Sequence, residues 1–320
     1  MPLKWVAFWM LGLVWGSSFL LIRIGVESVS PFQLVFMRTA IAAVGLNLVL
    51  YSRGHWARLI GGIRPLALIG VASITVPFAL ITWGEQVVDS GTASVLTATD
   101  ALFTLLISAL VFRSEPFTAR KLAGVLIGLV GVVVLVSRSL VGDAPQTASL
   151  PGQAAILLAA LFYAFSDSYA YRLSLRWDNW QMVAAGSMMF AAITSGVVML
   201  LSPALGGPAL TPLNEIPADA LLAILVLGVV NTFLNYMVYY WMIRQLGASR
   251  ASMVTYVAPV VGLALGALIL NETVDVRLIL GAALVLSGIA AVTLRFRWRA
   301  AATPTTAQAA AQLGAALAED

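Results

Sequence analysis

Two stretches of this 320-residue chain decide its fold, and they read E-P-F-T-A-R-K-L-A-G-V-L-I-G-L-V-G at 115–131 and E-T-V-D-V-R-L-I-L-G-A-A-L-V-L-S-G at 272–288. When 84–140 is placed over 241–297 at a constant offset of 157 residues, acidic, basic and glycine positions coincide. The coincident pairs are Ala101/Ala258, Glu115/Glu272, Arg120/Arg277, Gly124/Gly281, Leu129/Leu286 and Gly131/Gly288. A bias toward apolar residues does not readily produce matching charges and glycines in one ungapped register. We therefore interpret the chain as a duplicated unit.

The composition indicates that this unit lies in a lipid bilayer. Hydrophobic residues make up 61% of the chain and charged residues 10%, whereas soluble domains have about 45–50% and about 25%. Apolar runs of about 18 residues or more recur, and each is long enough to cross a hydrocarbon core of about 30 Å. We predict ten transmembrane helices, at about 5–24, 31–51, 65–83, 92–112, 119–138, 152–173, 180–201, 218–243, 250–270 and 276–296.

Each duplicated unit then contains five helices. Because five is an odd number, the second unit must enter the membrane in the opposite orientation to the first, as in many secondary transporters. The sequence thus predicts an all-α integral membrane protein of two inverted five-helix repeats, which move around a site near the membrane midplane. The predicted parts are a first repeat at 1–140, a connecting loop at 141–151, a second repeat at 152–298 and a mobile cytoplasmic tail at 299–320.

The basic residues predict the orientation of the chain. Counted from a cytoplasmic N-terminus, fourteen of the eighteen Lys and Arg residues fall in predicted inner segments. Three fall in outer segments, namely Arg23, Arg138 and Arg277, and the last, Arg38, falls within a helix. This positive-inside asymmetry predicts that both termini are cytoplasmic. The net charge of +4 therefore reflects topology, and we expect no nucleic-acid partner.

Several residue types and motifs that membrane-embedded enzymes use are missing from the sequence. The chain has no cysteine, and His55 is its only histidine, which excludes thiolate chemistry, iron–sulfur clusters and a zinc site of the H-E-x-x-H type. It contains neither a G-x-S-x-G motif nor a phosphate-binding loop of the form G-x-x-x-x-G-K-[ST]. We therefore expect no enzyme activity, no metal, no cofactor and no direct coupling to ATP.

Arg38 and Asp100 are charged residues that fall about two turns inside predicted helices. Arg38 lies about seven residues into the second helix from the outer side, which is roughly 10 Å deep at about 1.5 Å per residue. Asp100 lies at a similar depth in the fourth helix. A charge this deep must face a partner or a wet cavity. Two hypotheses stay open: the two residues form a fixed ion pair, or they take part in transport by binding a substrate carboxylate or carrying protons.

Polar and aromatic residues in other helices are candidates for a binding cavity. Asn231 and Asn235 lie one turn apart in the eighth helix and are expected to share a face. Together with Trp15, Tyr163 and Tyr256, they could line a cavity that suits an amino acid or an aromatic ring. The alternative for the asparagines is a role in joining helices, and interfacial packing is the alternative for the aromatic residues.

Three glutamates fall near predicted helix ends. Glu85 ends the third helix at the outer surface, where it is either a gate residue or a solvated cap. Glu115 and Glu272 begin the connections to the fifth and tenth helices, on opposite membrane faces, so we expect structural roles for both. We predict that Glu115 pairs with Arg120 and that Glu272 pairs with Arg277.

The repeat also carries a set of residues typical of one family. They are Trp15-Gly16-Ser17-Ser18-Phe19, Pro31 with Arg38, Glu85-Gln86, Ser90-Gly91, Glu115, Gly124 and Gly131, and in the second half Gly247, Ala251, Ser252, Pro259, Glu272, Gly281 and Gly288. On these residues, over about 5–297, the sequence resembles the EamA-type transporter family of the drug/metabolite transporter superfamily. One departure is Asp100-Ala101-Leu102, where the family usually has a proline and the second half keeps Pro259.

The resemblance implies a function. It implies export or exchange of small metabolites, often amino acids, by a multi-pass protein of the cell inner membrane with both termini in the cytoplasm. Uptake and the efflux of drugs or toxic compounds are the alternatives, and a channel is a further one. The expected partners are a small-molecule substrate and the lipid bilayer. Proton coupling and the oligomeric state are left open.

Overall fold

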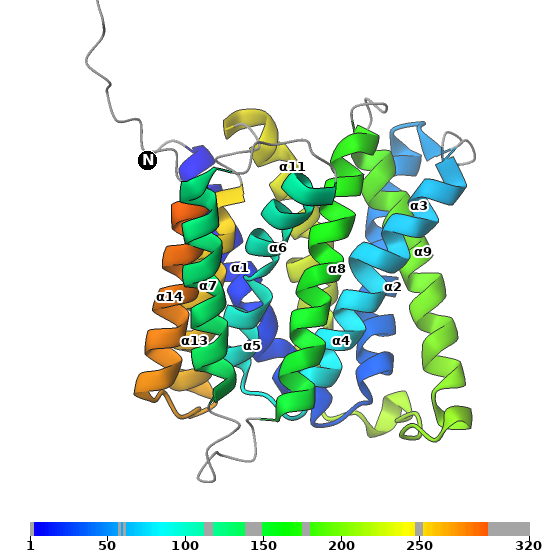
Figure 1. Cartoon of the computed structure of the whole chain (residues 1–320). Helices are drawn as coiled ribbons and strands as arrows, with labels where there is room; N and C mark the ends of the chain where they lie inside the picture. The colour runs from blue at the N-terminus through cyan, green and yellow to red at the C-terminus, as the bar shows by residue number, and fades with distance from the viewer. Residues whose placement is uncertain are drawn as a thin grey trace, which may run out of the picture.

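The structure, a computed structural model, describes residues 3–56, 59, 62–111, 118–137, 149–174, 180–246 and 252–293 (Figure 1). Most of the predicted connecting loop, the whole of the predicted tail and Glu115 lie outside these residues. Every regular element in the described ranges is a helix, as predicted. The predicted helices agree with the observed ones to within a few residues.

The helices of the first half follow the predicted order with added interruptions. They are α1 (Leu3–Val26), α2 (Pro31–Ser52), α3 (Ile63–Ile69), the π-helix η2 (Gly70–Thr75), α4 (Val76–Gly84), α5 (Ser90–Thr97), α6 (Asp100–Leu106), the π-helix η3 (Ile107–Val111) and α7 (Ala119–Ser137). Local sequence explains the start of α2, because the Ser30 hydroxyl accepts a hydrogen bond from the Gln33 N–H and Pro31 occupies the first helical position.

The second half repeats this order. Its main helices are α8 (Leu150–Ser174), α9 (Trp180–Leu201), α10 (Ala218–Gly228), the π-helix η7 (Val229–Leu234), α11 (Asn235–Leu246), the 3-10 helix η8 (Ser252–Tyr256), α13 (Val257–Ile269) and α14 (Val276–Thr293). Two short 3-10 turns, η5 (Pro203–Leu205) and η6 (Leu213–Glu215), lie between α9 and α10. By length and composition, seven described helical segments can cross a membrane, and three shorter apolar helices accompany them.

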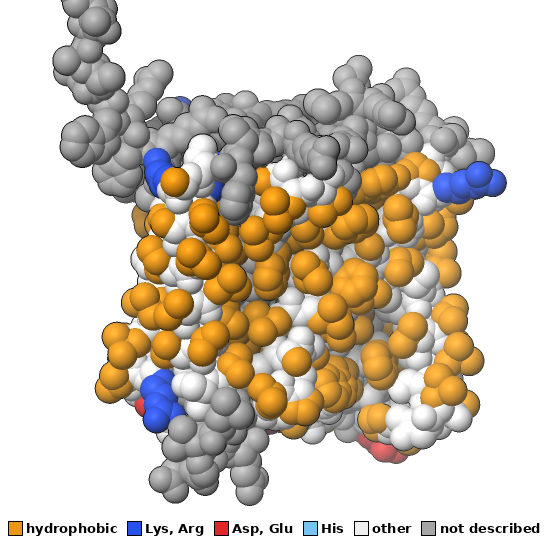
Figure 2. All heavy atoms as spheres, in the orientation of Figure 1, with side chains coloured by type: hydrophobic (Ala, Val, Ile, Leu, Met, Phe, Trp, Pro, Cys, Tyr) orange, Lys and Arg blue, Asp and Glu red, His pale blue; other side chains and the backbone are white. Residues whose placement is uncertain are grey.

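The surface of the bundle is apolar on its flanks. Figure 2 shows hydrophobic side chains between the two ends, with the Lys, Arg, Asp and Glu side chains of this face gathered at the ends. Leu268 on α13 is 79% exposed and Val133 on α7 is 67% exposed. So large an exposed apolar surface is unfavourable in water and favourable against lipid.

The repeat-related glycines meet in space and join α7 to α14. A Cβ atom on Gly124 would lie 2.8 Å from the Gly288 carbonyl oxygen, and one on Gly131 would lie 2.8 Å from the Gly281 carbonyl oxygen. Only glycine allows the two backbones to approach this closely. The two contacts are reciprocal, and their order along the chains makes the two helices antiparallel.

Helices α2 and α9 form a second antiparallel pair. Thr39 and Ser195 share a hydrogen bond of 2.9 Å, and the Asn47 amide donates to the Ala185 carbonyl oxygen over 3.1 Å. The residue numbers rise on one helix as they fall on the other. Related helices that pair in opposite directions are what an inverted repeat requires.

The related interruptions in the two halves are also placed alike. Thr75 in η2 and Thr232 in η7 are 157 residues apart, and each hydroxyl donates to the carbonyl oxygen five residues earlier, on Gly70 and Leu227. Helices α6 and α13 begin at Asp100 and Val257, again 157 residues apart. The offset of 157 residues found in the sequence therefore also relates the local backbone structure of the two halves, including positions before residue 84, where the sequence alignment begins.

Candidate functional site

A central cavity of about 330 Å³ lies between helices of both halves. The first half lines it with residues of α1, α2, the segments α3 to α4 and the segments α5 to α6. The second half lines it with residues of α8, α9, η7, α11, η8 and α13. Five predicted candidates line it, namely Trp15, Arg38, Asp100, Tyr163 and Asn231. Among the residues that the structure describes, no cluster of acidic or histidine side chains could hold a metal ion.

Arg38 is the charged group that α2 places at this cavity. The residue is buried, and its Nε atom donates to the Thr232 hydroxyl over 2.8 Å. The guanidinium carbon lies 4.0 Å from the centre of the Phe78 ring, a cation–π arrangement. These contacts fix the plane of the guanidinium, and its two terminal nitrogens make no hydrogen bond to any described residue. The arrangement can bind a carboxylate through two parallel hydrogen bonds.

Asp100 lines the same cavity but does not pair with Arg38. Arg38 bonds to Thr232 instead, and no ion pair between the two described charges is formed. Of the two hypotheses left open for these residues, the structure contradicts the fixed ion pair. The position of both residues along their helices follows from the sequence. Their partners depend on how each helix is rotated about its axis, and the hydropathy of the sequence does not specify that rotation.

The two asparagines have different surroundings. Asn231 lines the cavity, and its amide nitrogen donates to the Val14 carbonyl oxygen and, over 3.0 Å each, to the hydroxyls of Ser17 and Ser18 on α1. Asn235 is buried away from the cavity, and neither of its amide atoms has a hydrogen-bond partner among the described residues. The prediction that the two share a cavity face is wrong, because the π-helix η7 changes the residue spacing between them.

The aromatic candidates also separate into two groups. Trp15 packs against Tyr239, with ring centres 5.1 Å apart, and both line the cavity together with Tyr163. Tyr256 does not line it, since its hydroxyl donates to the Ile289 carbonyl oxygen over 3.2 Å. Residues that the sequence reading missed include Tyr236 and Tyr239. A signal was available, because both lie within two turns of Asn231 on one predicted helix.

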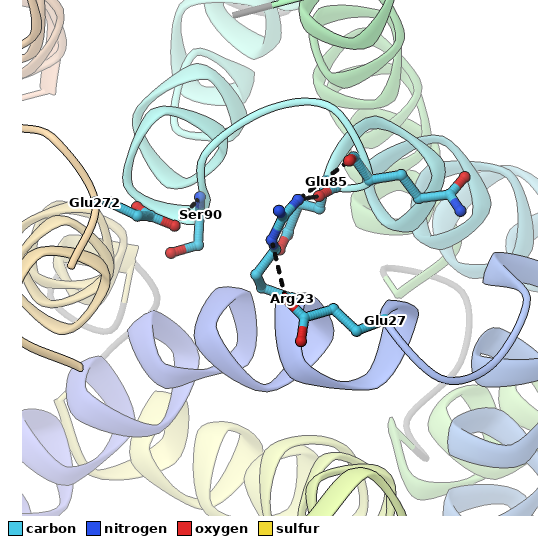
Figure 3. A network of polar contacts seen from close by, with 6 residues as sticks. Arg23, Glu27, Glu85, Ser90 and Glu272 are labelled. Carbon is cyan, nitrogen blue, oxygen red and sulfur yellow. Dashed lines mark hydrogen bonds and ion pairs between the residues drawn. The ribbon is translucent and has the colours of Figure 1, made fainter. Parts of the chain in front are cut away.

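One end of the cavity is closed by polar contacts at the end of the bundle where α1 passes into α2, here named the α1–α2 end (lower in Figure 1). Arg23 donates to the backbone carbonyl oxygens of Glu85 and Gln86, and Figure 3 shows Arg23 beside Glu85. The Arg23 Nε atom also lies 3.8 Å from a Glu27 carboxylate oxygen. Ile22, the residue before Arg23, is the last cavity-lining residue of α1. The contacts therefore lie on that helix directly beyond the cavity, toward the α1–α2 end.

Two further contacts at this end join the halves. Glu272, between α13 and α14, accepts hydrogen bonds from the backbone N–H groups of Ser90 (2.7 Å) and Gly91 (2.9 Å) at the start of α5 (Figure 3). The Gln33 side chain exchanges two hydrogen bonds with the Thr211 backbone, at 2.7 and 3.0 Å. The predicted pair of Glu272 with Arg277 is wrong, because the partners of the carboxylate are these N–H groups.

Glu85 itself lies inside the closed end. It directly follows the apolar segment Ile63–Gly84, is 0% exposed, and does not line the cavity. Of the two alternatives for Glu85, the structure therefore contradicts the solvated cap. Burial raises the pKa of the Glu85 carboxyl well above its ordinary value, and the carboxylate of Glu272 acts in the same direction. Arg23 and Arg38 oppose this shift.

Comparison with known proteins identifies relatives along nearly the whole chain. The inner membrane transporter YedA of Escherichia coli K12, described as uncharacterized, is 34% identical over 275 residues, which are 84% of this chain and 83% of YedA. A probable amino-acid metabolite efflux pump of Salmonella typhimurium is 27% identical over 291 residues, which are 89% of this chain and 93% of that protein.

The fold and the family are also matched. A solved crystal structure superposes with a TM-score of 0.65 at 20% identity, covering 93% of this chain and 98% of that one, which shows a shared fold. The model of the EamA-like transporter family matches twice, at residues 3–137 and 150–294. With its apolar helices and its duplicated halves, this chain belongs to the EamA-like transporter family and is a membrane transporter.

Proposed function

We propose that this protein is a secondary transporter that exports or exchanges small metabolites with a carboxylate group, such as amino acids, by alternating access. The observation that carries the proposal is the guanidinium of Arg38, which is oriented by Thr232 and Phe78 and has its terminal nitrogens available at a cavity shared by both halves. A planar guanidinium matches a carboxylate in geometry and in charge.

The other cavity residues fit an amino acid. Asp100 supplies a carboxylate for a substrate ammonium group, and the rings of Trp15, Tyr163 and Tyr239 supply an apolar and aromatic wall. A volume of about 330 Å³ is at the lower end of the range of about 300–1,000 Å³ typical of small-molecule sites. The name of the Salmonella relative, a probable amino-acid metabolite efflux pump, supports the same substrate class.

The proposal includes the arrangement in the membrane. All ten apolar helical segments cross the bilayer as two inverted repeats, 1–140 and 152–298, with both termini in the cytoplasm. The antiparallel pairing of α2 with α9 and of α7 with α14 supports this arrangement. In alternating access, the contacts of Glu272 and Gln33 at the α1–α2 end break as the two halves rock apart.

Counterflow in proteoliposomes tests the function. Liposomes are preloaded with unlabelled amino acids, purine bases or polyamines, and the uptake of the labelled counterpart is compared with empty liposomes. We expect saturable exchange for amino acids. In Arg38→Gln the half-saturating concentration should rise at least about tenfold, because a hydrogen-bonded charged partner contributes roughly 1.5–3 kcal/mol.

Arg64→Gln is the matched control, since it removes the same charge from an exposed position of α3 outside the cavity. Equal effects of the two substitutions would contradict a specific role for Arg38. Exchange of purines or polyamines only would contradict the substrate class, and flux without counterflow would indicate a channel. Export is then distinguished from uptake by whether cells that produce the protein release or accumulate the identified substrate.

A further inference from the structure

Glu85 is an unusual residue for a packed membrane bundle. Its two carboxylate oxygens are buried, and neither has a hydrogen-bond partner among the described residues. Buried carboxylates are normally paired or hydrogen-bonded, because an isolated ionised carboxylate is very unfavourable at low dielectric. Glu85 therefore needs a physical reason to be where it is.

No cation among the described residues forms an ion pair or a hydrogen bond with its carboxylate. Arg23 lies beside Glu85 in Figure 3, yet its guanidinium donates to the backbone carbonyl oxygens and its ion pair is with Glu27. The titratable and charged side chains on the described elements around Glu85 are Arg23 and Glu27 of α1, Arg38 of α2, Asp89 before α5, Tyr163 of α8 and Glu272 before α14. Acids outnumber the cations in this set, so the closed end is compatible with a neutral, protonated Glu85.

The second half carries no carboxyl group at the matching sequence position. The residue related to Glu85 by the offset of 157 is Met242 in the second half, and it is also 0% exposed. An apolar side chain of similar length thus occupies the matching sequence position, inside α11 rather than at the end of a helix.

We propose that Glu85 is a proton-binding site that couples protonation to the closure of the α1–α2 end. Closing buries the carboxyl group and takes up one proton, and opening brings water to it and releases the proton. Because the closed state holds the proton more tightly, low pH favours closure and rising pH favours opening. The inference rests on the proposed function, since it assigns the proton to the same alternating movement.

The chain contains no cysteine, so a single introduced thiol can report on this closure. In Val88→Cys, the thiol replaces a side chain that is 0% exposed, lies at the α1–α2 end and does not line the cavity. Its rate of reaction with a water-soluble maleimide is divided by that of Asn214→Cys, an exposed position at the same end. We expect this ratio to rise with pH, by up to about tenfold per pH unit, because opening releases one proton.

Variants of Glu85 identify the group responsible. Combined with Val88→Cys, Glu85→Gln is always neutral and should react slowly at every pH, while Glu85→Asp should keep the rise. If Glu85→Gln does not fold, Glu85→Met, which copies the residue at 242, replaces it. The proposal is overturned by a ratio independent of pH in the Val88→Cys parent, or by an unchanged rise in the neutral variant.

The labelling uses no substrate, so it is independent of the counterflow measurement. A pH-dependent ratio in a protein without counterflow would refute the proposed substrate class and leave the proton site in place. Normal counterflow with a ratio that ignores pH would refute the proton site alone.

Discussion

Asn231 and Asn235 show that the surroundings of a buried polar residue decide whether it stabilises the fold. Both are buried amides in one membrane segment, but the two N–H groups of Asn231 have three hydrogen-bond acceptors within reach on α1, and Asn235 makes no hydrogen bond among the described residues. A buried hydrogen-bonding group without a partner lowers stability by about 1–3 kcal/mol, whereas a satisfied group raises it. The two side chains should therefore respond in opposite ways to the same substitution.

We expect Asn231→Leu to lower the free energy of unfolding by about 1–3 kcal/mol, because it removes the amide hydrogen bonds that join η7 to Val14, Ser17 and Ser18 of α1. Asn235→Leu should be neutral or stabilising. Thermal unfolding of both variants in the same detergent measures the difference. A destabilisation of Asn235→Leu as large as that of Asn231→Leu would show that Asn235 has a partner that matters.

The residue scale is also where sequence reading was least successful. The depth of Arg38 follows from counting residues along a helix, but its partner Thr232 lies on another helix at a rotation that no local pattern encodes. Glu85 was placed at the surface by its position at a helix end, and long-range contacts bury it. Such contacts are properties of the closed bundle as a whole.

At the scale of elements, the glycines of α7 and α14 set the distance between two helices. Gly124→Leu places a side chain against the Gly288 carbonyl oxygen, and overpacking of this kind destabilises by about 1–3 kcal/mol. Ala123→Leu is the matched control, because the neighbouring position is exposed. Thermal unfolding should show a loss in the first variant and a change within about 0.5 kcal/mol in the second. Equal stability of the two would mean that the helices separate easily.

Helix positions could be predicted because bilayer thickness limits the length of an apolar run, and the glycine matches marked a real contact. The interruptions at η2 and η7 could not. They depend on tertiary hydrogen bonds, since the Thr75 hydroxyl, besides its bond within η2, also contacts the Ala191 carbonyl oxygen and Thr194 of α9. A composition-based reading treats such a segment as one straight helix, and it therefore misplaces the side chains beyond the interruption, as with Asn235.

At the scale of the whole molecule, the distribution of basic residues predicts which end faces the cytoplasm. We expect a membrane-impermeant maleimide to label Asn214→Cys at the α1–α2 end in intact cells, because this end is predicted to face outward. Ser52→Cys, exposed at the opposite end, should react only after the membrane is permeabilised. Labelling of Ser52→Cys alone in intact cells would reverse the orientation and with it the side from which Glu85 receives protons.

The pairing of α7 with α14 has a consequence for how such proteins diverge. These two helices carry the most recognisable part of the duplication, yet among the described residues neither contributes to the lining of the cavity. Mutations that change the transported substrate can therefore accumulate in the other helices. The glycines of α7 and α14 are under separate selection, because they allow the two backbones to touch. The residues that identify the family and the residues that determine the substrate therefore lie in different helices. Relatives with the same substrate are better identified by comparing the cavity residues of α1, α2, α9 and α11 than by overall sequence identity.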